Sequence, residues 1–218
     1  MRYGVLGTGT VGQTIAGKLV ALGHEVTMGS RRAGNEKAVA WSEEAGERAD
    51  EGSFEDAASF AEVVVNATAG IASLDALEAA GAANLAGKVL IDIANPLAPD
   101  SGMPPELAFC NTESLGERIQ DGFPDARVVK TLNTINAVVM VDPGSVPGSH
   151  NVFVSGNDSA AKAQVTELLQ SFGWPAEAVI DLGDISTARG PEMYLPLWLR
   201  LMVAGGSPAF NINVVRAD

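Results

Sequence analysis

Short apolar runs recur along this chain, separated by stretches that are typical of helices or loops. In VVVNA and VLIDI the apolar residues are continuous rather than alternating, as in parallel strands that helices cover on both faces. We therefore expect a doubly wound α/β fold, with a mostly parallel sheet between two layers of helices. The expected strands are YGVLG (3–7), HEVTM (24–28), AEVVVNA (61–67), GKVLIDI (87–93), ARVVKT (126–131), NVFVSG (151–156) and AVIDL (178–182).

The clearest helix follows the first strand. Its apolar residues Val11, Ile15, Leu19 and Leu22 have the spacing of one buried stripe, and Gly23 is a suitable end. This spacing predicts an amphipathic helix packed on the sheet.

A second helix is predicted after GNDS, where Asp158 or Ser159 can cap the N-terminus and Gly173 ends the helix. The proline and glycine content of residues 97–125 predicts a long loop before a short helix. A weak boundary falls within VDPGSVPGSH (141–150). We expect a first domain over residues 1–140, and a β-α-β extension with an apolar helix over 141–218 that packs on the same sheet.

Charge and composition exclude some classes of partner. The chain has 27 acidic and 14 basic residues and a net charge of −13, which opposes binding to nucleic acid or to an anionic membrane. Cys110 is the single cysteine, and MRYGVLGTG contains no extended apolar region, so we expect a cytoplasmic protein. MYLPLWLRLMVAGG is short for a membrane span and contains Pro196 and Arg200, which favours a buried or interface helix.

A glycine motif lies between the first strand and the first helix. Gly7, Gly9 and Gly12 form G-x-G-x-x-G: the first permits the tight turn, the second lets the backbone approach a pyrophosphate, and the third lets helix and strand pack closely. The helix N-terminus would face the phosphates. The order strand, glycine motif, helix, strand predicts a Rossmann-type dinucleotide site.

The second strand ends in GSRR, where an NAD-specific fold presents an acid to the ribose 2′-hydroxyl. Ser30 can hydrogen-bond a 2′-phosphate, and the guanidinium groups of Arg31 and Arg32 suit phosphate oxygens. We therefore expect residues 1–140 to bind NADP(H), with a solvated turn as the alternative.

The chain resembles the NADPH-dependent coenzyme F420 reductase family, also called F420-dependent NADP oxidoreductases. The resemblance rests on GTGTVG, LGHEVTMGSRR, VVKTLNTINA, VFVSGND and LGDISTARGPEMYLPLWLRL, which span most of the chain. For the phosphates, the resemblance implies that the pyrophosphate lies along Thr8, Gly9, Thr10 and Val11, and that the 2′-phosphate and adenine are surrounded by Ser30, Arg31 and Asn35. For the rest of the cofactor, it implies that the middle lies near Ala67 and Thr68, and that the nicotinamide ribose is covered by Asn95, Pro96 and Leu97. The place where the nicotinamide meets the acceptor ring would be flanked by Asn133, Thr134, Ile135 and Ala137.

One departure concerns the acceptor. Deazaflavin reductases of this family typically read HTIPA where this chain reads NTINA, so Asn133 replaces a histidine and Asn136 a proline. The expectation for the cofactor is unchanged. Other flavins and small electrophiles stay open as acceptors beside coenzyme F420.

Hydride transfer between two rings needs mainly positioning and exclusion of water. We expect Asn133, Thr134 and Ile135 to position the acceptor ring, since no Ser-His-Asp or zinc arrangement is visible and no metal is expected. His24 and His150 fall in turns before strands, where a surface role is favoured, and Cys110 has no adjacent base that would make it a nucleophile.

Three polar residues end apolar strands. Asp92 needs a partner and is expected to be a structural acceptor rather than a proton donor. Asn66 and Asn95 could bind cofactor groups or satisfy loop backbone, and we expect mixed roles.

The apolar terminal helix predicts a homodimer, as does the resemblance, with burial inside one subunit as the alternative.

Three functions remain open. The favoured one is an NADPH-dependent oxidoreductase acting on F420 or another flavin-like acceptor. The others are a reductase of another small acceptor, such as a quinone, an imine or a ferric chelate, and a nonenzymatic NADP-binding sensor.

Overall fold

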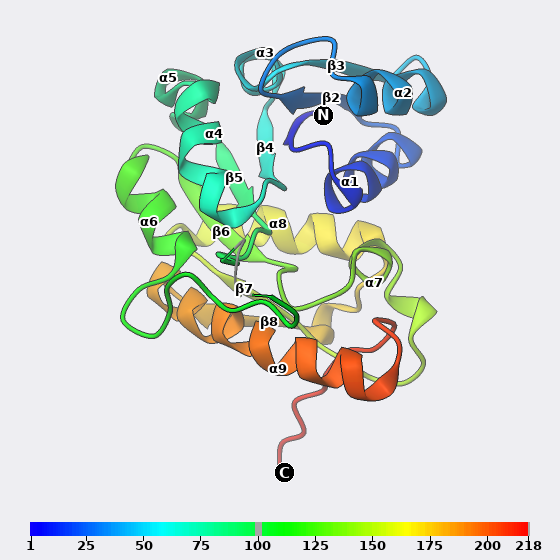
Figure 1. Ribbon diagram of the computed structural model, residues 1–218, viewed down its shortest axis with the longest axis vertical. Coiled ribbons are helices and arrows are strands. Elements are labelled where there is room, and N and C mark those ends of the chain that lie inside the picture. Colours follow the sequence, from blue (N-terminus) through cyan, green and yellow to red (C-terminus); the bar gives the residue numbers. More distant parts are fainter. Residues whose placement is uncertain (99–101, 218) are drawn as a thin grey trace.

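The computed structural model describes residues 1–98 and 102–217. One eight-stranded sheet runs through the molecule in the order β3-β2-β1-β4-β5-β6-β7-β8, with helices on both faces (Figure 1). The predicted fold class, a Rossmann-type doubly wound α/β fold, is confirmed. The strands are β1 (Arg2–Leu6), β2 (Glu25–Ser30), β3 (Ala49–Ser53), β4 (Val63–Asn66), β5 (Val89–Asp92), β6 (Arg127–Thr131), β7 (Val152–Ser155) and β8 (Val179–Gly183).

The helices connect these strands and cover the sheet. They are α1 (Thr10–Ala21), α2 (Glu36–Ala45), α3 (Phe54–Phe60), α4 (Ser73–Ala80), α5 (Ala82–Leu85), α6 (Leu115–Gly122), α7 (Ala137–Val141), α8 (Ser159–Phe172) and α9 (Arg189–Gly205). Short 3-10 helices are η1 (Gly70–Ala72), η2 (Pro143–Ser145), η3 (Ala176–Ala178) and η4 (Ile185–Ala188). Throughout the described residues, each helix is too short or too polar to cross a membrane.

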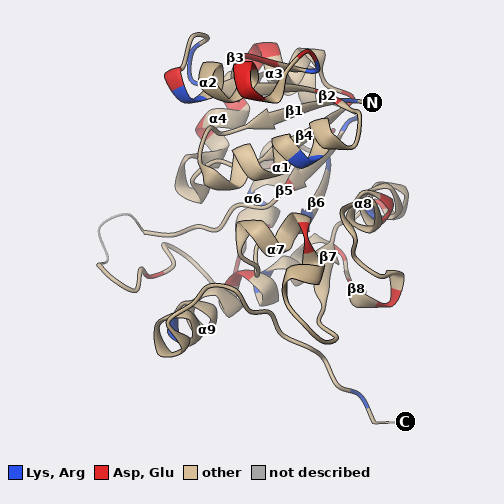
Figure 2. Ribbon diagram, turned by 90° about the vertical axis from the view of Figure 1, so that its right-hand side faces the viewer, with Lys and Arg blue, Asp and Glu red and all other residues tan. Residues whose placement is uncertain are grey.

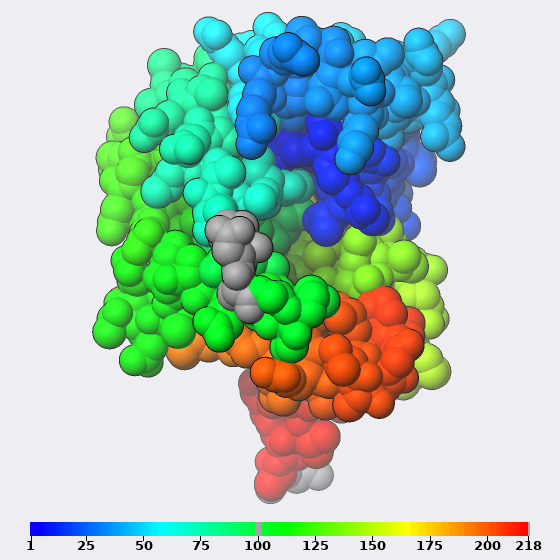
Figure 3. Space-filling view, in the orientation of Figure 1, coloured from blue at the N-terminus to red at the C-terminus, as the bar shows by residue number. Residues whose placement is uncertain are grey.

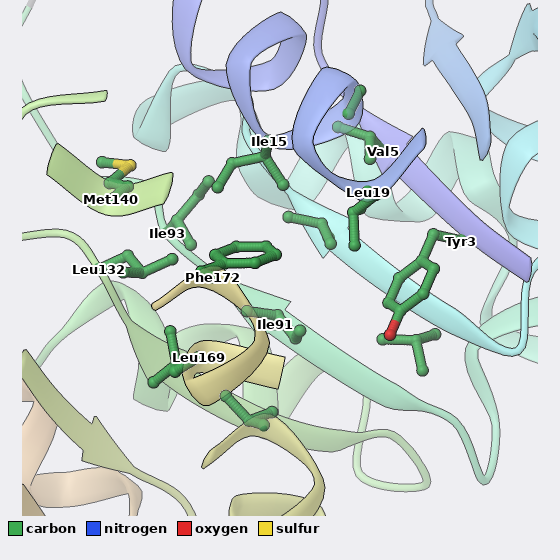
Figure 4. Packing of buried hydrophobic residues seen from close by; sticks show 14 of the residues in the cluster. Tyr3, Val5, Ile15, Leu19, Ile91, Ile93, Leu132, Met140, Leu169 and Phe172 are labelled. Atoms are coloured by element: carbon green, nitrogen blue, oxygen red, sulfur yellow. The ribbon is translucent and has the colours of Figure 1, made fainter. Parts of the chain in front are cut away.

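The continuous apolar strands serve two cores. Val63 and Val65 of β4 pack in the core beneath α1, α7 and α8, and Val64 packs in the opposite core beneath α3, α4 and α6. Figure 4 shows the first core, where Ile15 of α1 and Phe172 of α8 lie close together. Alternate residues of one strand therefore need apolar surroundings on both faces, as the sequence pattern indicates.

The sheet is parallel except where β7 meets β6. Lys130 and Thr131 pair with Ser155 and Val154 in antiparallel register. The chain leaves β6 at the carboxyl edge, forms α7 and η2, and returns along the neighbouring position without crossing the sheet. Since β7 and β8 join the same sheet as β6, the domain boundary between residues 140 and 141 stays a prediction.

One strand was missed, and one local expectation was wrong. The strand β3 was not foreseen, because its sequence ADEGS is polar and it pairs only with β2 at the edge of the sheet. Leu22 does not belong to the buried stripe of α1: it follows the last helical residue and is 38% exposed.

The expected helix after GNDS is confirmed. Asp158 accepts a hydrogen bond from the backbone N–H of Ala161, and Gly173 ends α8 in the left-handed conformation. The short helix expected after the long loop is α6.

Candidate functional site

The exits of β4, β5 and β6 meet above the carboxyl edge of the sheet in a pocket of about 250 Å³. Figure 3 shows the surface hollowed between the blue N-terminal residues and the orange α9. The pocket contains these expected site residues: Val11, Ala67, Thr68, Asn95, Leu97, Asn133 and Ile135. It also contains residues that sequence reasoning missed, namely Ala69, Gly70, Ile93, Ala94, Met140, Leu195 and Trp198.

The glycine motif forms a tight passage beside this pocket. Gly7 has φ +121°, and a Cβ there would lie 2.5 Å from the carbonyl oxygen of Ala67. A Cβ on Gly12 would lie 2.1 Å from the carbonyl oxygen of Gly7. Both positions need glycine because the helix, the turn and the exit of β4 are in direct contact.

Gly9 differs from the other two glycines. A Cβ built on it would meet no atom within 4 Å, so the space beside its backbone is open. Gly9 is also the N-cap of α1, and no side chain caps that helix. Uncapped N–H groups at the start of a 12-residue helix, next to open space, fit a pyrophosphate group.

The arginine turn lies at the far end of β2. Ser30 is buried, and its hydroxyl donates to the carbonyl oxygen of Arg32 at 2.5 Å, which shapes the turn. Arg31 and Arg32 are exposed, and no acid in the described part of the chain forms an ion pair with either. Asn35 caps α2 by accepting from the N–H groups of Lys37 and Ala38.

An acid does approach this turn from β3. Both carboxylate oxygens of Glu51 accept from the N–H of Gly34, at 3.1 and 3.0 Å. The expectation that no acid follows β2 therefore holds for the sequence at the end of that strand. In the folded chain, however, the neighbouring strand β3 brings the carboxylate of Glu51 to the turn. Glu51 escaped prediction because the strand that carries it was missed.

Asn95 and Asn133 join two walls of the pocket. Nδ2 of Asn133 donates to Oδ1 of Asn95 at 3.0 Å, and Nδ2 of Asn95 donates to the carbonyl oxygen of Asn133 at 2.8 Å. The segment after β4 also packs closely against Asn95. A Cβ on Gly70 would lie 2.1 Å from the carbonyl oxygen of Asn95. The floor of the pocket is therefore closely packed.

Thr68 connects the pocket to a buried polar chain. Its hydroxyl donates to Oδ1 of Asn66 at 2.7 Å, and Nδ2 of Asn66 donates to Oδ1 of Asp92 at 2.8 Å. Asp92 has the ion-pair partner that its burial demands, because Nζ of Lys130 lies 2.8 Å from Oδ2. Lys130 was not singled out from the sequence.

Several expected site residues lie outside the pocket lining. Thr134 is buried, Pro96 stands between two lining residues, and Ala137 is the first residue of α7. Asn136, which replaces the proline of the resembling family, caps α7 by accepting from the N–H of Val138 at 3.0 Å.

The histidines lie away from the pocket. His24 is partly buried against Tyr3, with ring centroids 5.0 Å apart. His150 is also partly buried: its ring packs edge-on against Trp174, and Nε2 lies 3.0 Å from the carbonyl oxygen of Pro143. His150 therefore holds the loop before β7 in place. Cys110 is exposed.

Residues 2–96 match the sequence model of the family described as NADP oxidoreductase, coenzyme F420-dependent. A crystal structure from Arthrobacter sp. FB24, of a protein proposed to be an F420-dependent NADP reductase, is 56% identical, with a TM-score of 0.92 over 99% of both chains.

Two other similarities are more distant. The metalloreductase STEAP3 of Rattus norvegicus is 30% identical in an alignment 212 residues long, which covers 90% of this chain and 38% of the rat protein. The chain thus spans well under half the length of that relative. An imine reductase of Bacillus cereus is 16% identical, with a TM-score of 0.66 over 94% of this chain and 62% of the other, which shows a shared fold alone.

Proposed function

This chain belongs to the family of coenzyme F420-dependent NADP oxidoreductases, and we propose that it transfers a hydride between NADP(H) and a flavin-like acceptor, with coenzyme F420 as the first candidate. The pocket carries this proposal: it joins a glycine cradle on one side to the apolar wall of α9 on the other. Such a site can hold two planar rings against each other with little water between them.

The residues beside the cradle suit NADP(H). The open space at Gly9 and the uncapped start of α1 would hold the pyrophosphate. Arg31 and Arg32, which are exposed, would bind the 2′-phosphate. Bound NADPH would supply the hydride, and its nicotinamide end would lie toward Thr68 and Asn95.

The remaining pocket residues exclude water and position the acceptor. Ile93, Ile135, Met140, Leu195 and Trp198 give the pocket an apolar lining. Asn133 is held by its bond to Asn95, so its contribution is to fix the floor beneath the acceptor. We propose that Asn133, Thr134 and Ile135 act through this positioning.

The lining of the pocket supports the proposal of a flavin-like ring over an imine. Among the described lining residues there is no Asp, Glu, His, Lys, Cys or Tyr that could donate a proton. Reduction of an imine or a ketone needs such a donor near the reacting atoms. A conjugated ring can accept a hydride, delocalise the resulting negative charge, and take up a proton from solvent afterwards.

The test is NADPH oxidation with a panel of acceptors: coenzyme F420, FMN, riboflavin, a quinone, an imine and a ferric chelate. We expect turnover with F420 or a flavin, and slower or no turnover with the imine. Turnover with the ferric chelate or quinone alone would replace the flavin-like acceptor. Tight NADPH binding without turnover of any acceptor would favour a nonenzymatic sensor.

We also propose a cytoplasmic homodimer that buries the outer face of α9. Leu197 is 54% and Val203 63% exposed, and most of the α9 ribbon in Figure 2 has the tan colour of residues other than Lys, Arg, Asp and Glu. A large exposed apolar surface of this kind favours association. Light scattering that finds only a 22.5 kDa particle would reject the dimer.

A further inference from the structure

Lys130 is completely buried between two carboxylates. Its Nζ lies 2.8 Å from Oδ2 of Asp92 and 2.8 Å from Oε1 of Glu192, and the three side chains are 0%, 0% and 2% exposed. Burial alone would lower the pKa of Lys130, but Asp92 and Glu192 outweigh that effect and raise it. The lysine is therefore a permanent cation at neutral pH.

The polar groups of this triad have further partners on several elements. Nζ of Lys130 also donates to the carbonyl oxygen of Ala94 at 2.5 Å. Glu192 accepts from the backbone N–H groups of Leu115 and Gly116, at 2.8 and 3.1 Å. The triad thus connects β5, β6, the start of α6 and the start of α9, and a buried ion pair keeps its geometry because a misplaced charge there is costly.

The triad lies behind both walls of the pocket. Ala94 lines the pocket and precedes Asn95, which holds Asn133. Glu192 precedes Leu195 by about one helical turn and Trp198 by about two, and both of these residues line the pocket from the opposite side. The ammonium group of Lys130 therefore contacts both Ala94, on one side of the pocket, and Glu192 of α9, the helix that carries Leu195 and Trp198.

We propose that Lys130, acting through Glu192, is a positioning residue that sets the distance between the cofactor-side floor and the acceptor-side wall of the pocket. The inference rests on the proposed function, because it assigns Leu195 and Trp198 to the acceptor. It requires the buried connection to control acceptor use, while the cradle at Gly9 keeps its affinity for NADPH.

The chain provides a matched control. Arg189 and Glu117 also join α9 to α6, with Nε to Oε2 at 2.8 Å, but this pair is only partly buried, with the Arg189 and Glu117 side chains 38% and 16% exposed. Replacing Arg189 breaks a connection between the same two helices without touching the triad. A partly exposed ion pair contributes less to stability than a fully buried one, so Arg189→Gln should perturb the molecule much less than a change within the triad.

The experiment compares Glu192→Gln with Arg189→Gln. In Glu192→Gln the amide keeps the size of the carboxylate, but its NH2 group must replace one of the two oxygens. In place of Oε1 it would face the ammonium of Lys130 and the N–H of Gly116, and in place of Oε2 it would face the N–H of Leu115. We expect the KM for the acceptor to rise, or kcat to fall, by about tenfold or more. The Kd of NADPH from calorimetry should stay within about twofold, and Arg189→Gln should stay within about twofold in every parameter.

A second variant guards against unfolding of the first. Glu192→Asp keeps the charge but shortens the side chain, so it should draw α9 inward and raise the KM for the acceptor by a smaller factor. A folded Glu192→Gln protein with unchanged kinetics, a parallel loss of NADPH affinity, or an equal effect of Arg189→Gln would overturn the inference.

Hydrogen exchange separates this inference from the proposed function. If the unaltered protein turns over no acceptor, the proposed function fails. The positioning role is then decided by amide exchange of residues 190–200 with NADPH bound, which should be faster in Glu192→Gln than in Arg189→Gln. Equal exchange in the two variants would reject it.

Discussion

Asn95 and Asn133 bond reciprocally across the floor of the pocket: each side-chain amide donates to the other residue, at 2.8 and 3.0 Å. Their strands, β5 and β6, are neighbours in the sheet, but the two residues lie beyond the last ladder pairs. The amide pair therefore continues the connection between the strands into the loops. The position where the resembling family has a histidine is here part of this clamp.

Asn95→Ala should loosen the floor, because it removes both bonds at once. Each lost hydrogen bond to a neutral partner is worth about 0.5–1.5 kcal/mol, so urea unfolding should show a loss of about 1–3 kcal/mol. The kcat should fall along with stability. Asn84→Ala is the control: it removes a bond from an asparagine amide to the carbonyl oxygen of Ala80, at 2.8 Å and away from the pocket. Equal effects on kcat would argue against a role for the floor.

Arg31→Glu should weaken NADPH binding by about 1–3 kcal/mol, because it removes a charge-assisted contact and adds repulsion. NADH binding should be unchanged, since NADH has no 2′-phosphate. Calorimetry with both cofactors measures the difference. Arg48→Glu makes the same change of charge at an exposed site just before β3 and should affect neither cofactor. Equal losses for NADPH and NADH in Arg31→Glu would contradict the phosphate assignment.

The fold could be predicted where the signal was local. The strands β4 and β5 are apolar without interruption, and the helix α8 has both a capping aspartate and a terminal glycine. The strand β3 carries no such signal, because Asp50 and Glu51 face solvent or the arginine turn. It forms a strand through its hydrogen bonds to β2. Propensity cannot identify a strand that its neighbour creates.

The candidate site divides in the same way. The glycine motif and GSRR lie within about one β-α-β unit, so their joint meaning can be read from order alone. The buried ionic contacts join residues that are far apart in the sequence. Asp92 and its partner Lys130 are separated by 38 residues, and Glu192 is 77 residues from Leu115, whose N–H it binds. The charge of Asp92 predicted that a partner exists, but only the pairing of β5 with β6, which places Lys130 opposite Asp92, identifies that partner.

The two tyrosines should titrate late. Burial raises the pKa of Tyr3 to about 12, with a smaller contribution from Glu62, and burial also raises the pKa of Tyr194. A raised folded-state pKa means that the stabilisation from neutral Tyr3 is complete below its unfolded value of 10.0 and is lost as the pH rises toward about 12.

The unfolding free energy should therefore decline between about pH 10 and 12 in the unaltered protein, and decline less in Tyr3→Phe. Absorbance at the phenolate band measures the titration directly, and urea unfolding at several pH values measures the stability. Normal titration of Tyr3 near its unfolded value in the native protein would contradict the prediction.

Gly9→Val and Gly12→Ala should fail in opposite ways. Gly9 has φ −78° and ψ 176°, which valine adopts readily, and its Cβ would enter open space. The fold should survive, and NADPH affinity should fall because the side chain fills the place of the pyrophosphate.

At Gly12 the added Cβ would lie 2.1 Å from the carbonyl oxygen of Gly7, so α1 must move from β1 at a cost of about 1–3 kcal/mol. Thermal unfolding and NADPH calorimetry together distinguish the two outcomes. Unchanged NADPH affinity in a folded Gly9→Val protein would show that the cradle does not hold the cofactor.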